Sequence, residues 1–310
     1  MTFAKNKLKK VFHSAEGFAV VIAILLLLII SKNVAYHVRE GILLCFNVII
    51  GSVFPFVIIT DLAVSKLTLD RIDLLKRSFE HTFKISGAAL SAFICGTLCG
   101  FPLGARLADK LYSEGAISKD EFERLIGIST NSGPAFVISG IGVAMRGNLK
   151  DGIFLYSISL ASSILTGIIF SHGQKYSVGS YKMQNSCFNF TESVKNATLT
   201  TLSVCGFVTV FSVITGIFNA LPISEGLKLI TLPFLELSNA ATVFSKTKLL
   251  TDNASFIITA FAISFTGFCA HLQVKSFISS KEISMKRYYL MKLLSASFSA
   301  IIATILISIS

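Results

Sequence analysis

The amino-acid sequence predicts an all-α polytopic membrane protein with a transporter-like architecture. We expect two repeated halves, inverted relative to each other, that contain re-entrant hairpins and broken helices. Hydrophobic residues make up 53% of the 310 residues and charged residues only 15%, against about 25% in soluble domains. Charge-free stretches of nearly the roughly 20 residues that cross a bilayer recur along the chain. This composition excludes a soluble enzyme, a secreted disulfide scaffold and a disordered chain.

The expected spans follow these charge-free stretches. Membrane helices are predicted at residues 15–35, 41–63, 152–172, 197–220, 227–245 and 287–309. No A-x-A-like cleavage site follows the first stretch, so we expect a retained helix there rather than a signal peptide. Residues 173–196 form the longest polar loop, and they divide a first half, residues 1–172, from a second half, residues 197–310.

The net charge of +11 is explained by basic loops, which set the orientation of membrane proteins, and no nucleic acid partner is expected. Two loops, before the first predicted span and after the second, are rich in basic residues, and the loop between those spans is not. The loops on one side of the membrane carry nine basic residues: Lys5, Lys7, Lys9, Lys10, Lys66, Arg71, Lys76, Arg77 and Lys84. The loop on the other side carries two, Lys32 and Arg39. This asymmetry predicts a cytoplasmic N-terminus.

Cysteines and catalytic motifs point away from metal binding and catalysis. Five of the six cysteines lie in apolar runs, where Cys packs as a small hydrophobe; the six are Cys45, Cys95, Cys99, Cys187, Cys205 and Cys269. The sequence has no P-loop, no H-E-x-x-H zinc site and no G-x-S-x-G elbow. We therefore expect no enzyme, no catalytic residue, no metal and no bound cofactor.

The first candidate site lies in residues 85–127, which we expect to form a re-entrant hairpin. An apolar arm is followed by a Gly- and Pro-rich tip and an amphipathic return arm. The tip holds Gly100, Pro102 and Gly104, with Arg106 one turn later. A helix break inside the bilayer frees backbone groups that a polar ligand can satisfy, and Arg106 is suited to an anion. The alternative is a tight turn with a snorkelling arginine.

The second candidate site is the run Asn131, Ser132, Gly133 and Pro134, which precedes an apolar segment. Asn and Ser are helix caps and Pro favours the first helical position. A helix that starts within the membrane exposes free N–H groups and the positive end of its dipole to an anion or a polar ligand. An ordinary cap at the membrane interface is the alternative.

The second half contributes two further candidates. Glu236, followed by Ser238 and Asn239, lies near the middle of a predicted span, where an ionisable group is costly and indicates function. It is suited to carry a proton, bind a cation or anchor substrate, and a purely structural pairing is the alternative. Gly267, followed by His271 and Gln273, offers substrate hydrogen bonds. Packing is the alternative for His271.

The two halves resemble each other in sequence. Gly100 and Phe101 align with Gly267 and Phe268 at an offset of 167 residues, and an Ile-Ser pair follows both in register with one gap. We therefore expect the tips at 100–106 and 267–273 to be equivalent. Duplicated halves with broken helices are typical of transporters, which bind substrate between the halves.

These motifs resemble a known family. The stretch "GTLCGFPLGARLADKLYSEGAIS", followed by "EFERLIGISTNSGPAFVISGIGVAM", is similar to the nucleoside-recognition, or Gate, domain of YlbJ-type sporulation integral membrane proteins. The likeness covers roughly residues 40–305. It implies a permease-like fold related to nucleoside transporters. It also implies transport of dipicolinic acid, a small aromatic dianion, from the mother cell through the outer forespore membrane.

The sequence thus predicts a bacterial membrane transporter for a small polar or anionic metabolite, with dipicolinic acid favoured. Substrate and lipid bilayer are the expected partners, with a coupling proton or sodium ion and a homo-oligomer or a sporulation membrane partner as further expectations. Two alternatives stay open. One is a carrier of nucleosides or other neutral metabolites, and the other is a membrane assembly factor that transports nothing.

Overall fold

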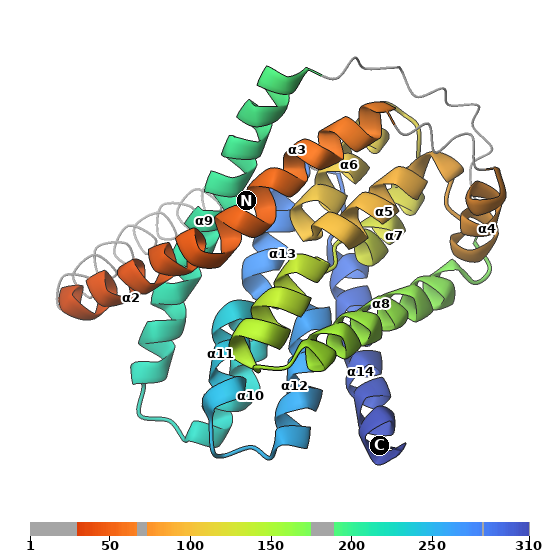
Figure 1. Cartoon of the computed structure of the whole chain (residues 1–310). Helices are drawn as coiled ribbons and strands as arrows, with labels where there is room; N and C mark the ends of the chain where they lie inside the picture. The colour runs from red at the N-terminus through yellow and green to blue at the C-terminus, as the bar shows by residue number, and fades with distance from the viewer. Residues whose placement is uncertain (1–29, 67–72, 175–188, 281, 310) are drawn as a thin grey trace, which may run out of the picture.

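The computed structural model describes residues 30–66, 73–174, 189–280 and 282–309, and every regular element within them is helical (Figure 1). The first half contains α2 (Ser31–Leu44), η1 (Cys45–Ile49), α3 (Ile50–Lys66), α4 (Asp73–Phe83), η3 (Gly87–Ala89), α5 (Leu90–Cys99), α6 (Phe101–Ser113), α7 (Lys119–Ser129), η4 (Ala135–Met145) and α8 (Leu149–Ser171). The second contains α9 (Phe190–Ala220), α10 (Glu225–Leu235), α11 (Leu237–Lys246), α12 (Asp252–Phe265), α13 (Gly267–Ser276) and α14 (Lys286–Ile309).

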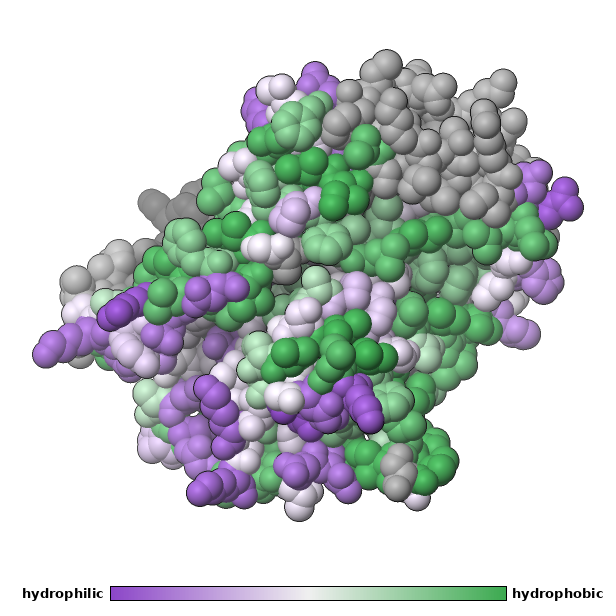
Figure 2. Space-filling view, viewed as in Figure 1, coloured by the Kyte–Doolittle hydropathy of each residue, from purple (hydrophilic) through white to green (hydrophobic). Residues whose placement is uncertain are grey.

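Four helical segments of the described residues are long and apolar enough to cross a membrane: α8, α9, α14 and the run from α12 through α13. Counting two bent pairs as spans raises the number to six. The spans predicted at 152–172 and 287–309 are confirmed as α8 and α14. Apolar side chains cover much of the face shown in Figure 2, and exposed apolar residues of α8 include Phe154 and Ile169. Such a surface is expected where lipid replaces water.

The chain before residue 66 differs from the prediction. Residues 31–66 run as one helical stretch through α2, η1 and α3, with a bend of 42° after Ile49. The loop expected around Lys32 and Arg39 is therefore wrong, because both residues lie exposed on α2, where no proline ends the helix. Most of the span predicted at 15–35, and the basic chain start, lie outside the described residues.

Two short helices in each half form a hairpin. Helix α5 reverses into α6 at Gly100, whose φ of +100° is a conformation that favours glycine. Helix α10 likewise packs back onto α11, with the reversal at Glu236. The span predicted at 227–245 is therefore wrong as a single helix. Glu236 adopts extended backbone angles there, and this ends one helix and begins the next.

A broken helix and a long helix follow each hairpin. After the first hairpin, α7 ends at Ser129 and η4 resumes at Ala135, and α8 follows. After the second, α12 ends at Phe265 and α13 begins at Gly267, and α14 follows. The order hairpin, broken helix, long helix thus occurs twice. Gly100 corresponds to Glu236, and the predicted equivalence of Gly100 with Gly267 is wrong, because the chain continues past Gly267 as a span instead of turning back.

The long helices α8 and α14 pack side by side and run antiparallel. Ser171, at the end of α8, and Arg287, at the start of α14, both contact α7. Half-way along, Ser295 on α14 donates a hydrogen bond to Ser162 on α8 (3.4 Å). Equivalent helices that run in opposite directions are the arrangement of an inverted repeat.

The core has two main apolar clusters, and α14 crosses both. One gathers around Phe122 and Leu125 of α7 with Met291 of α14. The other gathers around Phe244 of α11 and Ile263 of α12, and also takes in residues of η4, α8 and α14. The clusters hold the two hairpins in place, so that their tips and the two helix breaks meet between them.

Candidate functional site

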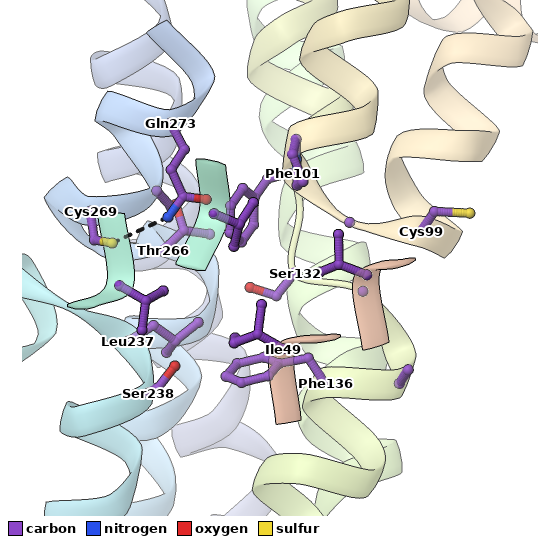
Figure 3. A pocket seen from close by; sticks show the side chains of 18 of the residues that line it. Ile49, Cys99, Phe101, Ser132, Phe136, Leu237, Ser238, Thr266, Cys269 and Gln273 are labelled. Atoms are coloured by element: carbon purple, nitrogen blue, oxygen red, sulfur yellow. Dashed lines mark hydrogen bonds between the residues drawn. The ribbon is translucent and has the colours of Figure 1, made fainter. Parts of the chain in front are cut away.

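Both hairpin tips and both helix breaks line one cavity (Figure 3). Its walls are largely apolar, with Phe101 and Phe136 on one side and Leu237 on the other. Its volume is about 60 Å³, which is room for a few water molecules. Seven residues predicted as binding residues line it: Gly100, Pro102, Ser132, Gly133, Glu236, Ser238 and Gln273.

The tip of the first hairpin is placed by close backbone approach. A Cβ atom added to Gly96 or Gly104 would lie 2.0 or 2.2 Å from the carbonyl oxygen of Ser129, so only glycine fits at either position. Gly104 therefore packs α6 against α7 and lies outside the cavity lining. Pro102 sits in the first turn of α6, where its missing N–H is not needed. Gly100 then faces the cavity.

The break between α7 and η4 brings Ser132 and Gly133 to the cavity. The Ser132 hydroxyl donates to the carbonyl oxygen of Ile263 (3.4 Å), which links this break to α12. Asn131 turns away, because its side-chain Nδ2 donates to the carbonyl oxygen of Ile128 (2.7 Å). Pro134 precedes η4 and also lies outside the lining.

Glu236 is buried at the tip of the second hairpin and caps α11. Its carboxylate accepts hydrogen bonds from the backbone N–H groups of Ser238 (2.9 Å) and Asn239 (2.7 Å). Ser238 lines the cavity. The Asn239 side chain lies outside the lining, and its Nδ2 is buried without a partner in the described residues. The ionisable group found in the sequence is thus both a cavity residue and a helix cap.

The break between α12 and α13 contributes Thr266 and Gln273. Thr266 and Gly267 both have positive φ values, and a Cβ atom on Gly267 would lie 3.1 Å from the carbonyl oxygen of Leu235. Gly267 therefore fits this break against the second hairpin, outside the cavity lining. Gln273 donates to the Cys269 sulfur (3.2 Å), and its Oε1 has no partner in the described residues. That oxygen is available to a ligand.

His271 and Arg106 lie away from the cavity. His271 packs among aromatic rings, with its Nδ1 2.9 Å from the Tyr288 hydroxyl. Arg106 faces Asp61, with 3.9 Å between Nη1 and Oδ1, and Asp61 also accepts a hydrogen bond from Ser193 (3.0 Å). The predicted meeting of Arg106 with a bound anion has no geometric support here.

The electrostatics of the cavity come from backbone rather than from arginine. Residues at the N-termini of α6, η4, α11 and α13 all line it. Each N-terminus presents free N–H groups and the positive end of a helix dipole, and Glu236 already occupies the one at α11. Within the described residues no group of His, Cys, Asp and Glu side chains is arranged to hold a metal ion.

Two residues were not predicted from the sequence: Thr266, which lines the cavity, and Lys292, which contacts Thr130 next to the cavity wall. Thr266 precedes Gly267 as Ser132 precedes Gly133, and this shared hydroxyl–glycine pair marks both breaks in the sequence. Lys292 lies buried within α14, and its Nζ donates to the carbonyl oxygen of Thr130 (2.6 Å). Its signal was a lone lysine inside a predicted span, a position that indicates function.

The fold and the site define a polytopic helical membrane protein whose broken helices meet at one cavity. A comparison with curated proteins finds the sporulation integral membrane protein YlbJ of Bacillus subtilis strain 168. The alignment is 23% identical over 310 residues and covers 86% of this chain and 76% of that protein. The match confirms the predicted resemblance and supports membership of the YlbJ-type family. No family model and no solved structure matches the chain.

Proposed function

We propose that this protein transports a small polar or anionic metabolite through a membrane during spore formation, and that the metabolite is dipicolinic acid. The observation that carries the proposal is the convergence of four helix N-termini on one cavity between two inverted repeats. Helix N-termini bind anions through free N–H groups and the helix dipole. The name of the similar Bacillus subtilis protein supports a role in a membrane during spore formation. The family resemblance supports dipicolinic acid as the substrate.

Dipicolinic acid matches the chemistry of the cavity walls. It is a flat aromatic ring with two carboxylates, and the cavity offers aromatic side chains, Phe101 and Phe136, beside the N-termini of α6 and η4. At about 60 Å³ the cavity is too small for such a ring. We expect the hairpin tips at Gly100 and Glu236 to separate when substrate enters, as gates do in transporters that alternate between two openings.

The proposed setting is the outer forespore membrane or the cytoplasmic membrane of the mother cell, with the N-terminus in the cytoplasm. The test is uptake of labelled dipicolinate into proteoliposomes, with labelled uridine in parallel. Empty liposomes and the Glu236→Gln protein serve as controls. Saturable dipicolinate uptake that uridine does not inhibit is the expected result. Uptake of neither compound by folded protein would overturn transport of both.

A neutral metabolite is the second candidate, and Glu236 favours it. A buried carboxylate in the cavity repels an anion, whereas it accepts hydrogen bonds from hydroxyl groups such as those of a nucleoside. The same assay separates the two candidates. Saturable uridine uptake that dipicolinate does not inhibit would select the nucleoside carrier.

A further inference from the structure

Lys292 is a buried lysine whose amine contacts one backbone oxygen and one amide oxygen within the described residues. Its side chain is 1% exposed. Nζ donates to the carbonyl oxygen of Thr130 (2.6 Å) and to Oδ1 of Asn131 (3.2 Å). Among the described residues no carboxylate lies within 4.0 Å of it. The ammonium is therefore bound like an ion at the C-terminal end of α7, where carbonyl groups lack helical partners.

A purely structural role does not require the charge. The carbonyl oxygen of Thr130 needs one hydrogen-bond donor, and a neutral side chain supplies that at lower cost than a buried ammonium without a counter-ion. The amine also contacts the helix break beside the cavity. Its partners Thr130 and Asn131 directly precede Ser132 and Gly133, which line the cavity wall.

The surroundings of Lys292 hold no fixed negative charge within the described residues. His271 faces it from α13, and Tyr288, one turn earlier on α14, hydrogen-bonds to His271. The charged residues of α7, such as Asp120 and Arg124, lie about one and a half to three turns before Thr130, toward the other end of that helix.

Helices α8 and α12 contribute hydroxyl groups next to this region. Ser295, one turn after Lys292, donates to Ser162 of α8 (3.4 Å), and Ser162 lies 3.4 Å from Ser264 of α12. These hydroxyl groups are neutral, so they supply no negative charge that would neutralise a protonated amine at Lys292. The charge at this position is then set by one event, the binding or loss of a proton at Nζ.

We propose that Lys292 is the proton-binding site of the transport cycle, a role that rests on the transport function proposed above. When Nζ is protonated, the ammonium holds the segment between α7 and η4 in its present conformation by binding Thr130 and Asn131. When Nζ passes its proton to water that enters from one side of the membrane, the neutral amine binds these oxygens weakly and the break is released. Nζ then takes one proton back from water that enters from the opposite side of the membrane.

The first test needs no substrate. Cys99 lines the cavity and its backbone contacts Gly133 of the break, so we expect release of the break to change the rate at which N-ethylmaleimide alkylates its thiol. The protein retains Cys99 while its other five cysteines are replaced by alanine. Rates are measured from acidic to mildly alkaline pH with Lys292 and with Lys292→Met, and their ratio at each pH cancels the titration of the thiol itself. Lys286→Met, an exposed position on the same helix, is the matched control.

We expect the protein with Lys292 to react about fivefold more slowly than Lys292→Met at acidic pH, with the two rates converging as pH rises. Lys286→Met should follow the parent at every pH. A ratio that does not change with pH would overturn the proposal. Should the methionine variant not fold, Lys292→Gln takes its place, because it keeps a donor and cannot titrate. Its ratio to the parent should vary with pH in the same way.

The second test separates this inference from the transport proposal. Uptake of labelled dipicolinate into proteoliposomes is measured with and without an imposed pH gradient. The gradient should accelerate uptake by the parent and leave Lys292→Met unaffected. Absence of uptake combined with Lys292-dependent alkylation would reject dipicolinate transport and retain the proton site. Uptake that ignores the gradient in both proteins would overturn proton coupling.

Discussion

The carboxylate of Glu236 accepts a 2.7 Å hydrogen bond from the backbone N–H of Asn239, three residues further along the chain. With a second bond from Ser238, it occupies the N-terminus of α11. The same carboxylate lines the cavity. An incoming ligand that needs either the carboxylate or these N–H groups therefore competes with the cap, so ligand binding and the conformation of the second hairpin tip are linked.

Replacing Glu236 should separate capping from transport. Glu236→Ala removes both cap bonds and should cost about 1 kcal/mol of stability, the usual effect of losing a helix cap. Glu236→Gln keeps one side-chain oxygen as an acceptor and should lose less. Both should abolish uptake in proteoliposomes. Glu225→Gln, at an exposed position on α10, is the control and should transport normally. Normal uptake by Glu236→Gln would remove the carboxylate from the mechanism.

The close contact between α6 and α7 predicts opposite effects at two glycines. Gly104→Ala would place a methyl group 2.2 Å from the carbonyl oxygen of Ser129. Backbone cannot yield easily, so we expect a loss of about 3 kcal/mol. Gly206→Ala, in the interior of α9 with open space around it, should gain about 0.5 kcal/mol, as alanine favours helix. Melting temperatures in detergent measure both, and equal effects would contradict the packing described.

The long helices were predictable from sequence because their signal is local. The stretch predicted at 152–172 became α8, Leu149–Ser171, since an apolar run without charge specifies a span by itself. The break at Glu236 was missed, although Pro233 and a capping carboxylate mark it. Single residues of this kind also occur inside continuous helices, so they do not predict a break by themselves.

The pairing of the halves was not predictable, because apolar sequences match one another by chance. Gly100 and Gly267 each begin a Gly-Phe pair in register, yet the chain reverses at the first and continues past the second. Only tertiary contacts distinguish these outcomes. The same holds for Arg106, whose sequence neighbours place it one turn from a cavity residue while its side chain turns to Asp61.

Gln273 rather than Arg106 should determine substrate affinity. The Oε1 atom of Gln273 has no partner in the described residues, and the side chain lines the cavity. We expect Gln273→Ala to weaken substrate binding about tenfold, equivalent to one hydrogen bond of about 1.4 kcal/mol. Arg106→Gln should leave affinity unchanged, because Arg106 faces Asp61. Concentration-dependent uptake gives both values, and a larger effect at Arg106 would restore its role in anion binding.

The junction of α7 and α14 should make stability depend on pH. Asp120 accepts hydrogen bonds from Arg124 (3.1 Å) and from Arg287, and it joins the two helices. Burial alone would raise the pKa of Asp120, but the hydrogen bond from Arg287 and the charges of Arg124 and Arg287 outweigh it. They hold this pKa below its ordinary value of 3.8. The charged form is therefore favoured by folding.

It follows that Asp120 contributes its full stabilisation above pH 3.8, the value expected in the unfolded chain, and loses it as pH falls through the lower folded value. Asp120→Asn should lower the melting temperature at neutral pH, because it leaves the buried Arg124 without its carboxylate. The difference from the parent should shrink toward zero under strong acid. Asp252→Asn, at an exposed position in the first turn of α12, should show a smaller difference. An Asp120→Asn effect that persists undiminished in acid would mean that packing, and not charge, joins the two helices.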